Sequence, residues 1–185
     1  MKIVKNFING EIASFSEDTL DIFDPSKGEV IRKVVNSNSE DFDKVIESSV
    51  NSQKNWSKVT PLNRSRILQK YKFLLEKNID SLAEVICEEH GKTYDDAKGS
   101  IVRGIEVVEF ASGIPHLLKG DYSSQVGSNI DSWSVRQPLG VCAGITPFNF
   151  PAMVPMWMYP ISIACGNTFI LKPSEKNPSC SIRLA

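Results

Sequence analysis

Apolar and polar residues alternate along the first part of the chain with the period of a β-strand. The stretch "KNFINGEIA" (5–13) alternates around Asn9-Gly10, a dipeptide that favours a tight hairpin because both of its turn residues need positive φ. The stretch "DIFDPSKGEVIRKV" (21–34) predicts a second pair of strands with a turn at 25–28. Residues 1–36 are therefore expected to form small β-structures.

From residue 37 the apolar positions recur with the period of a helix, and four helices are expected before residue 115. The first is predicted to begin at "SNSE", where Ser37 and Glu40 fit a capping box. The second is predicted to have Thr60 as its N-cap and Pro61 as its first residue, because proline tolerates that position well.

Glycines are expected to end the third helix and to allow close packing of the fourth. The third is expected over about 80–90, with Gly91 as a left-handed C-cap. The fourth covers 94–114, and Gly99 and Gly104 would let a neighbouring element pack closely against it. Its predicted core face consists of Ile101, Ile105, Val108 and Ala111.

Beyond residue 120 the pattern changes twice. Residues 121–138 are polar, with alternation around Ile130 and Trp133, which predicts an exposed β-ribbon. The run 137–171 then contains no charged residue and is long enough for a membrane helix. Two asparagines interrupt it, no basic cluster flanks it, and four prolines break its interior (Pro147, Pro151, Pro155 and Pro160), so we do not expect it to cross a membrane.

The uncharged run is better explained as a buried β-α-β unit. Residues 141–147 and 167–173 read as apolar strands, and 151–166 reads as a helix with Pro151 at its first position. Strands of a parallel sheet are covered on both faces, which explains the missing charge. Because both strands would end at one edge of the sheet, Asn149 and "KPSEK" (172–176) are expected to lie near one crevice.

The polar residues at this edge allow two interpretations. An ammonium that donates and a carboxylate that accepts, such as those of Lys172 and Glu175, suit the hydroxyls of a ribose. The same two residues could equally be solvated members of a loop, and Asn149 could simply cap the following helix. No GxGxxG phosphate-binding pattern is present.

Composition excludes several classes of function. The chain has 185 residues, a formal net charge of -1 and 23% charged residues, which gives no basis for binding to nucleic acid or to an anionic membrane. Its two histidines stand alone, so no metal site is expected. Its four cysteines show no CxxC spacing and no signal peptide precedes them, which favours reduced thiols and a cytoplasmic location.

The blocks "PFNFP" (147–151) and "LKPSE" (171–175), separated as they are here, resemble the aldehyde dehydrogenase superfamily. The resemblance extends along the whole chain and includes "FINGE", "NWSKV" and "EHGKT". It implies an α/β fold: helices, the first β-α-β of a Rossmann-like parallel sheet, and an exposed β-ribbon. The implied domains are a hairpin and helical part of the NAD-binding domain (1–120), a ribbon of the bridging or oligomerisation region (121–138), and the start of the nucleotide-binding sheet (139–185).

Within the superfamily the chain is most similar to the CoA-acylating branch that acts on methylmalonate and malonate semialdehydes. The resemblance implies NAD-dependent oxidation of a small-molecule semialdehyde to an acyl-CoA, with CoA as co-substrate, by a homo-oligomer (a dimer or a tetramer). It also implies that the nucleophilic Cys and the Glu base lie beyond residue 185, so the chain alone is expected not to oxidise aldehydes. Because a sheet of two strands leaves an edge bare and apolar faces uncovered, the chain alone is also expected to be poorly stable or to need a partner. The alternatives are a non-acylating aldehyde dehydrogenase and a truncated relative that acts as a binding module.

The resemblance also assigns roles to individual residues. Asn149 would donate its side-chain amide to the oxyanion that develops during the reaction. None of the four cysteines matches the nucleophile. The implied contacts to NAD are made by Thr146, Phe148, Lys172, Glu175 and Lys176.

Arg103, in "RGIE", resembles the residue that grips the substrate carboxylate in this branch. A guanidinium matches a carboxylate through two parallel hydrogen bonds, and malonate semialdehydes carry a carboxylate. The alternative is an exposed helix arginine that forms an ion pair with Glu106 or Asp96.

Overall fold

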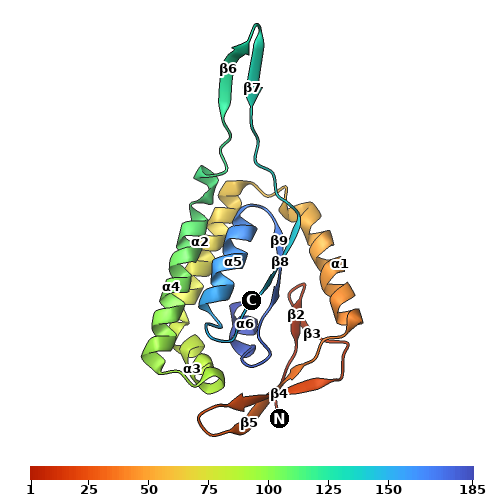
Figure 1. Cartoon of the computed structure of the whole chain (residues 1–185), viewed down its shortest axis with the longest axis vertical. Coiled ribbons are helices and arrows are strands. Elements are labelled where there is room, and N and C mark those ends of the chain that lie inside the picture. Colours follow the sequence, from red (N-terminus) through yellow and green to blue (C-terminus); the bar gives the residue numbers. More distant parts are fainter.

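The computed structural model describes residues 1–185, and its N-terminal part consists of two small β-structures (Figure 1). A three-stranded sheet has the order β1-β5-β4, and β2 and β3 form a separate antiparallel hairpin. Asn9 (φ 53°) and Gly10 (φ 82°) form the turn of that hairpin, which confirms the prediction. The strands are β1 (Ile3–Val4), β2 (Asn6–Ile8), β3 (Glu11–Ala13), β4 (Thr19–Asp24) and β5 (Glu29–Val35).

Four helices follow, and their boundaries show how far local sequence signals determine where a helix begins and ends. Thr60 caps the second helix with Pro61 as its first residue, and Gly91 (φ 79°) ends the third, as predicted. The fourth ends two residues early and passes into a short 3₁₀ turn (Ile114–His116). The helices are α1 (Ser39–Trp56), α2 (Pro61–Lys77), α3 (Ile79–His90) and α4 (Tyr94–Ser112).

The predicted capping box of α1 is wrong by one residue. Asn38 is the N-cap: its side chain accepts from the Asp41 amide at 3.0 Å, and Asp41 accepts from the Asn38 amide at 3.2 Å. The Asp41 carboxylate also accepts from the amides of Phe15 and Ser16, at 2.9 and 3.2 Å. These tertiary bonds to the preceding loop fix the box at Asn38, and the local pattern could not show them.

The main core lies between the helices, and α4 packs along α5 (Met153–Ala164). The predicted core face of α4 is confirmed, because all four of its residues are buried. A Cβ on Gly104 would lie 2.3 Å from Cε of Met156, so this glycine permits the close packing of α4 on α5. A Cβ on Gly99 would meet nothing, so the same expectation for Gly99 is wrong.

The β-α-β unit is present as predicted. Strands β8 (Val141–Ile145) and β9 (Thr168–Lys172) pair in parallel, with α5 between them in sequence. Helix α5 begins two residues after Pro151 rather than at it. Pro155 has no amide N–H, so the Pro151 carbonyl receives no helical bond and instead accepts from the Ser181 hydroxyl at 3.5 Å.

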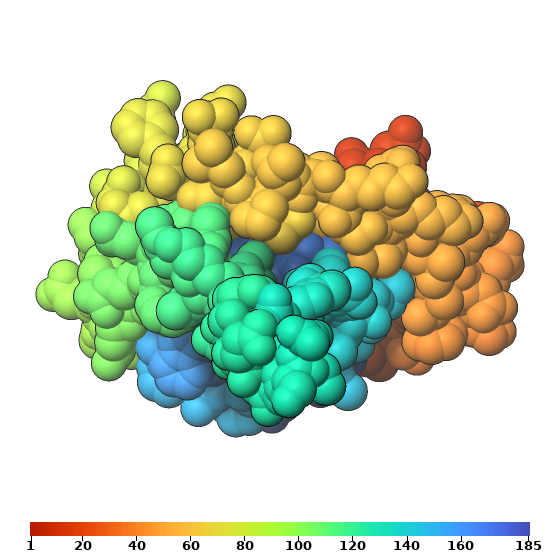
Figure 2. All heavy atoms as spheres, turned by 90° about the horizontal axis from the view of Figure 1, so that it is seen from above, coloured from red at the N-terminus to blue at the C-terminus, as the bar shows by residue number.

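The predicted ribbon is also present. Strands β6 (Tyr122–Gly127) and β7 (Ile130–Trp133) pair antiparallel and project from one end of the molecule (Figure 1). Figure 2 looks onto that end, where the ribbon lies in front of the body with α1 on one side and α4 on the other. Almost every ribbon residue is exposed. No helix combines the length and the hydropathy that a bilayer crossing requires.

Candidate functional site

The carboxyl ends of β8 and β9 define the candidate site. The register pairs Ile145 with Lys172, so the two strands end side by side. Beyond the last pair, the Thr146 amide donates to the Lys172 carbonyl at 3.0 Å. Residues 146–152 follow β8 and are called the β8 loop below; residues 173–178 follow β9 and are called the β9 loop. The predicted convergence of these two segments at one sheet edge is therefore confirmed.

Lys172 and Glu175 form an exposed pair at the start of the β9 loop. The Lys172 Nζ atom lies 3.2 Å from Glu175 Oε2, and each side chain is about half exposed. The backbone amide of Glu175 lowers the pKa of its own carboxyl group, and Lys172 lowers that pKa further. An exposed pair of this kind contributes at most about 1 kcal/mol to stability. A donor and an acceptor therefore stand next to each other, open to a ligand.

Phe148 joins the two loops through its ring and its carbonyl. Its ring lies 6.4 Å from the His90 ring and 4.4 Å from the Lys176 ammonium. Its carbonyl accepts a hydrogen bond from Asn177 Nδ2 at 2.7 Å. About half of the Phe148 side chain remains exposed, so an apolar face is available next to the Lys172–Glu175 pair.

Asn149 lies at the tip of the β8 loop and is exposed. Its amide makes no hydrogen bond, and α5 has no side-chain cap, so the alternative that Asn149 caps this helix is wrong. Thr146, in contrast, is buried, with 4% of its surface exposed. Asn149 can donate to a ligand at this edge as it stands, whereas a contact between Thr146 and a cofactor stays a prediction.

Arg103 lies on the exposed side of α4. Its Nε atom donates to the Gly99 carbonyl at 3.3 Å, and it makes no ion pair with Glu106. Asp96 pairs instead with Lys92 at 2.8 Å. Arg103 is therefore an exposed helix arginine, as the alternative expected, but it makes no direct ion pair with Glu106 or Asp96. The guanidinium makes no hydrogen bond or ion pair with either loop.

The end of α3 contributes site residues that the sequence pattern did not single out. Besides His90 on Phe148, the Lys92 ammonium lies 4.5 Å from the centre of the Phe150 ring. Glu89 accepts from the Ser179 amide at 3.1 Å, just past the β9 loop. All three belong to "EEHGK" (88–92), so this short segment packs against the β8 loop and bonds to the end of the β9 loop. Its only signal in the sequence is the family resemblance of "EHGKT".

His90 predicts a dependence of stability on pH. Both ring nitrogens are buried and neither makes a hydrogen bond of good geometry. Burial first, then Lys92, lowers the pKa of His90 below 6.5, against the opposing influences of Asp96 and of the backbone of Asn149 and of His90 itself. Between this lowered pKa and 6.5 the unfolded state binds more protons than the folded state, so stability falls as the pH falls through this range. Thermal unfolding from pH 8 to pH 5 should show this loss in the wild type and a smaller one in His90→Gln.

Carboxylates that titrate near pH 4 act equally on both proteins, so the difference between the two melting temperatures isolates His90. Its charged neighbours, Lys92 and Asp96, are unchanged in the variant. Parallel curves for wild type and His90→Gln would show that His90 does not cause the loss.

Three of the four cysteines, Cys87, Cys165 and Cys180, are poorly suited to form a thiolate. Burial raises the pKa of Cys180 to about 12, and it raises the pKa of Cys87 and of Cys165 as well. The thiolate is the nucleophilic form, and apolar surroundings disfavour it.

The structure also holds no cluster of three or more His, Cys, Asp or Glu residues that could bind a metal ion.

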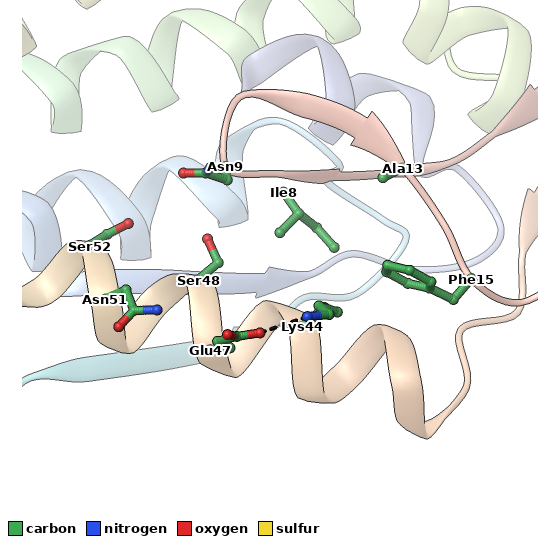
Figure 3. Close-up of a pocket in the computed structure, with 9 residues that line it drawn as sticks. All are labelled: Ile8, Asn9, Ala13, Phe15, Lys44, Glu47, Ser48, Asn51 and Ser52. Atoms are coloured by element: carbon green, nitrogen blue, oxygen red, sulfur yellow. Dashed lines mark hydrogen bonds and ion pairs between the residues drawn. The ribbon is translucent and has the colours of Figure 1, made fainter.

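A separate hollow of about 320 Å³ lies between the β2–β3 hairpin and α1 (Figure 3). Ser48 and Ser52 point from α1 toward the hairpin, and the Lys44–Glu47 ion pair (2.8 Å) lies along the same helix. None of the β8 or β9 loop residues lines it. Its lining consists of Ile8, Asn9, Ala13, Phe15, Lys44, Glu47, Ser48, Asn51 and Ser52.

This fold and site define the class of protein. Residues 12–185 match the aldehyde dehydrogenase family, and the chain belongs to that family. Structures of the family superpose on the entire chain, including the ribbon and the β-α-β unit.

The particular relatives are semialdehyde dehydrogenases. The chain is 50% identical over 185 residues to the malonate-semialdehyde dehydrogenase of Pseudomonas aeruginosa, and it covers 37% of that protein. It is 47% identical, over 97% of its length, to a Dictyostelium discoideum protein described as an acylating methylmalonate-semialdehyde/malonate-semialdehyde dehydrogenase, and it covers 34% of that protein. A Sinorhizobium meliloti 1021 protein, described as a methylmalonate-semialdehyde dehydrogenase and solved with NAD, matches the whole chain with a TM-score of 0.97 at 49% identity. The chain covers 38% of that structure, so it spans little more than a third of these relatives.

Proposed function

We propose that this chain is the N-terminal, cofactor-binding portion of an NAD-dependent dehydrogenase of malonate or methylmalonate semialdehyde. The observation that carries the proposal is the exposed Lys172–Glu175 pair beside the unpaired amide of Asn149 at one sheet edge. The relatives support it through the activities for which they are named and through the NAD in one of their structures.

The residues at this edge fit the chemistry of NAD. The Lys172 ammonium can donate to ribose hydroxyls, and the Glu175 carboxylate can accept from them. The half-exposed ring of Phe148 offers an apolar surface near this edge, and the Lys176 ammonium lies 4.4 Å from the centre of that ring. NAD, once bound, would accept the hydride that the aldehyde carbon loses. Thr146 is buried, so it would contribute to cofactor binding by holding the carboxyl end of β8 in place.

Asn149 would act on the oxygen of the aldehyde. When a thiolate attacks the carbonyl carbon, negative charge moves to that oxygen, and a fixed N–H donor stabilises the charge. We propose that this thiolate comes from the part of the relatives that the chain does not cover. None of the four cysteines lies in the β8 loop or the β9 loop, and burial raises the pKa of Cys87, Cys165 and Cys180. The chain would then be inactive alone. The exposed ribbon, in which Trp133 is 70% exposed, supports a homo-oligomer.

Arg103 would bind the carboxylate of the semialdehyde. Its terminal guanidinium nitrogens make no ion pair, so they can form the parallel hydrogen bonds that a carboxylate accepts. In the native protein at its natural length, Arg103→Leu should raise KM for malonate semialdehyde by about 10- to 100-fold, the loss expected for hydrogen bonds to a charged group. KM for propanal, which carries no charge, should be unchanged. NADH formation measures both.

Arg66→Leu is the matched control, since Arg66 is also an exposed helix arginine but lies on α2. Equal KM values for malonate semialdehyde in Arg103→Leu and in wild type would overturn the substrate assignment. The same assays with and without CoA decide the second reactant. NADH formation coupled to acyl-CoA supports the acylating reaction, and formation of a free acid without CoA favours the non-acylating alternative.

A further inference from the structure

One side chain connects the two loops of the candidate site. Asn177 lies in the β9 loop, and its Nδ2 atom donates to the Phe148 carbonyl at 2.7 Å, across 29 residues of sequence. Phe148 directly precedes Asn149, while Lys172 ends β9 and Glu175 lies in the same loop as Asn177. The bond therefore fixes the backbone next to Asn149 to the loop that carries the cofactor pair.

The environment of Asn177 indicates that this bond is its main role. The residue is 2% exposed, and its Oδ1 atom is buried without any hydrogen-bond partner. A buried polar atom without a partner opposes folding, so an apolar residue of the same size would avoid that cost. The only interaction that an amide adds at this position is the bond to Phe148.

The β8 loop needs such a constraint because Asn149 has none of its own. Its side chain is exposed and makes no hydrogen bond. Its direction is therefore set by the backbone on either side. The Phe150 ring lies under Lys92 on one side, and the Phe148 carbonyl is bound to Asn177 on the other.

We propose that Asn177 is a positioning residue that fixes the direction of Asn149 relative to the Lys172–Glu175 pair. This inference rests on the proposed function, in which Asn149 donates to the oxyanion. Loss of the bond frees the Phe148 peptide group to rotate, so the Asn149 amide no longer points at one fixed place. A displacement of about 1 Å at a catalytic donor can lower the rate by about 10²-fold.

The chain offers a matched control in Asn167. This asparagine is 5% exposed, it precedes β9, and its side chain also ties backbone together, accepting from Gly140 N at 3.0 Å and donating to the Ser162 carbonyl at 3.2 Å. It lies at the opposite end of the strand from the candidate site. Asn167→Ala therefore reports the loss of a buried asparagine without the loss of the loop connection.

The test compares Asn177→Leu, Asn177→Ala and Asn167→Ala in the native protein at its natural length. The amides of Thr146 and Val154 lie at the two ends of the β8 loop and donate to the carbonyls of Lys172 and Phe150 at 3.0 and 3.2 Å. Their hydrogen exchange should become at least about tenfold faster in both Asn177 variants and stay at the wild-type rate in Asn167→Ala. The kcat for semialdehyde oxidation should fall about 10- to 100-fold in the Asn177 variants, with KM for the semialdehyde little changed. Asn177→Leu keeps the volume of the side chain, so this readout does not depend on a variant that leaves a cavity.

Exchange at Thr146 and Val154 that is unchanged in Asn177→Leu would overturn the inference. So would faster exchange with a wild-type kcat, or an equal fall in kcat in Asn167→Ala. A wild-type protein that forms no NADH from any semialdehyde would instead overturn the proposed function, and the exchange measurement would still decide whether Asn177 holds the loop.

Discussion

Replacing Asn149 by alanine is expected to lower kcat for semialdehyde oxidation by about 10²–10³-fold, the effect of removing one oxyanion donor. The Asn149 side chain makes no hydrogen bond in the structure and caps no helix, so the substitution removes no structural interaction. An interaction that forms only in the transition state lowers kcat and kcat/KM by the same factor. Steady-state NADH formation in the native protein, at saturating NAD, measures both constants.

Two further variants separate a catalytic role from a structural one. Asn149→Asp keeps the shape but replaces the donor by a carboxylate that repels an oxyanion, so its kcat should be as low as that of Asn149→Ala or lower. Asn55→Ala changes another exposed asparagine, on α1, and should leave kcat unchanged. A wild-type kcat in Asn149→Ala would remove Asn149 from the chemistry.

The convergence of Asn149 with Lys172 and Glu175 could be predicted because it depends only on local patterns. The uncharged run, its prolines and Gly166 divide the sequence into strand, helix and strand, and parallel pairing then forces both strand ends to one edge. The Asn-Gly turn and the ribbon were predictable for the same reason. Each is determined by residues close together in the sequence.

The supports of the site could not be predicted, because their partners are far apart in the sequence. Glu89 reaches Ser179 across 90 residues, and Asn177 reaches Phe148 across 29. Neither residue belongs to a periodic pattern, and burial of a charge or of an amide shows only after packing. The start of α1 follows the same logic, since bonds from Phe15 and Ser16 decide that Asp41 completes the capping box.

For Arg103, neither the sequence pattern nor the structure alone establishes a role. The sequence allowed an ion pair on α4, and the structure excludes it because Lys92 already holds Asp96. The structure does not bring Arg103 into contact with the β8 loop, so its role depends on the semialdehyde spanning the space between them. The comparison of malonate semialdehyde with propanal tests whether Arg103 binds the carboxylate that only the semialdehyde carries.

Glu89→Gln is expected to lower the free energy of unfolding by about 3 kcal/mol, roughly 150-fold in the unfolding equilibrium constant, because it breaks a buried ion pair. The Glu89 side chain is 1% exposed and its carboxylate receives donors from two directions: Arg32 at 3.1 Å, and the amide and hydroxyl of Ser179. Glutamine has the same shape but only one acceptor oxygen, so its NH₂ group must face another donor. Urea unfolding followed by tryptophan fluorescence measures the change.

Glu88→Gln is the matched control for this substitution, since Glu88 pairs with the same Arg32 but is 53% exposed and does not reach Ser179. Pairs this exposed contribute at most about 1 kcal/mol, so Glu88→Gln should unfold close to the wild-type midpoint. The difference between the two variants is the contribution of burial and of the bonds to Ser179. Equal urea midpoints for Glu88→Gln and Glu89→Gln would show that the burial of Glu89 and its bonds to Ser179 add no stability. Glu89 would then act only through Arg32, and α3 would not stabilise the end of the β9 loop through Ser179.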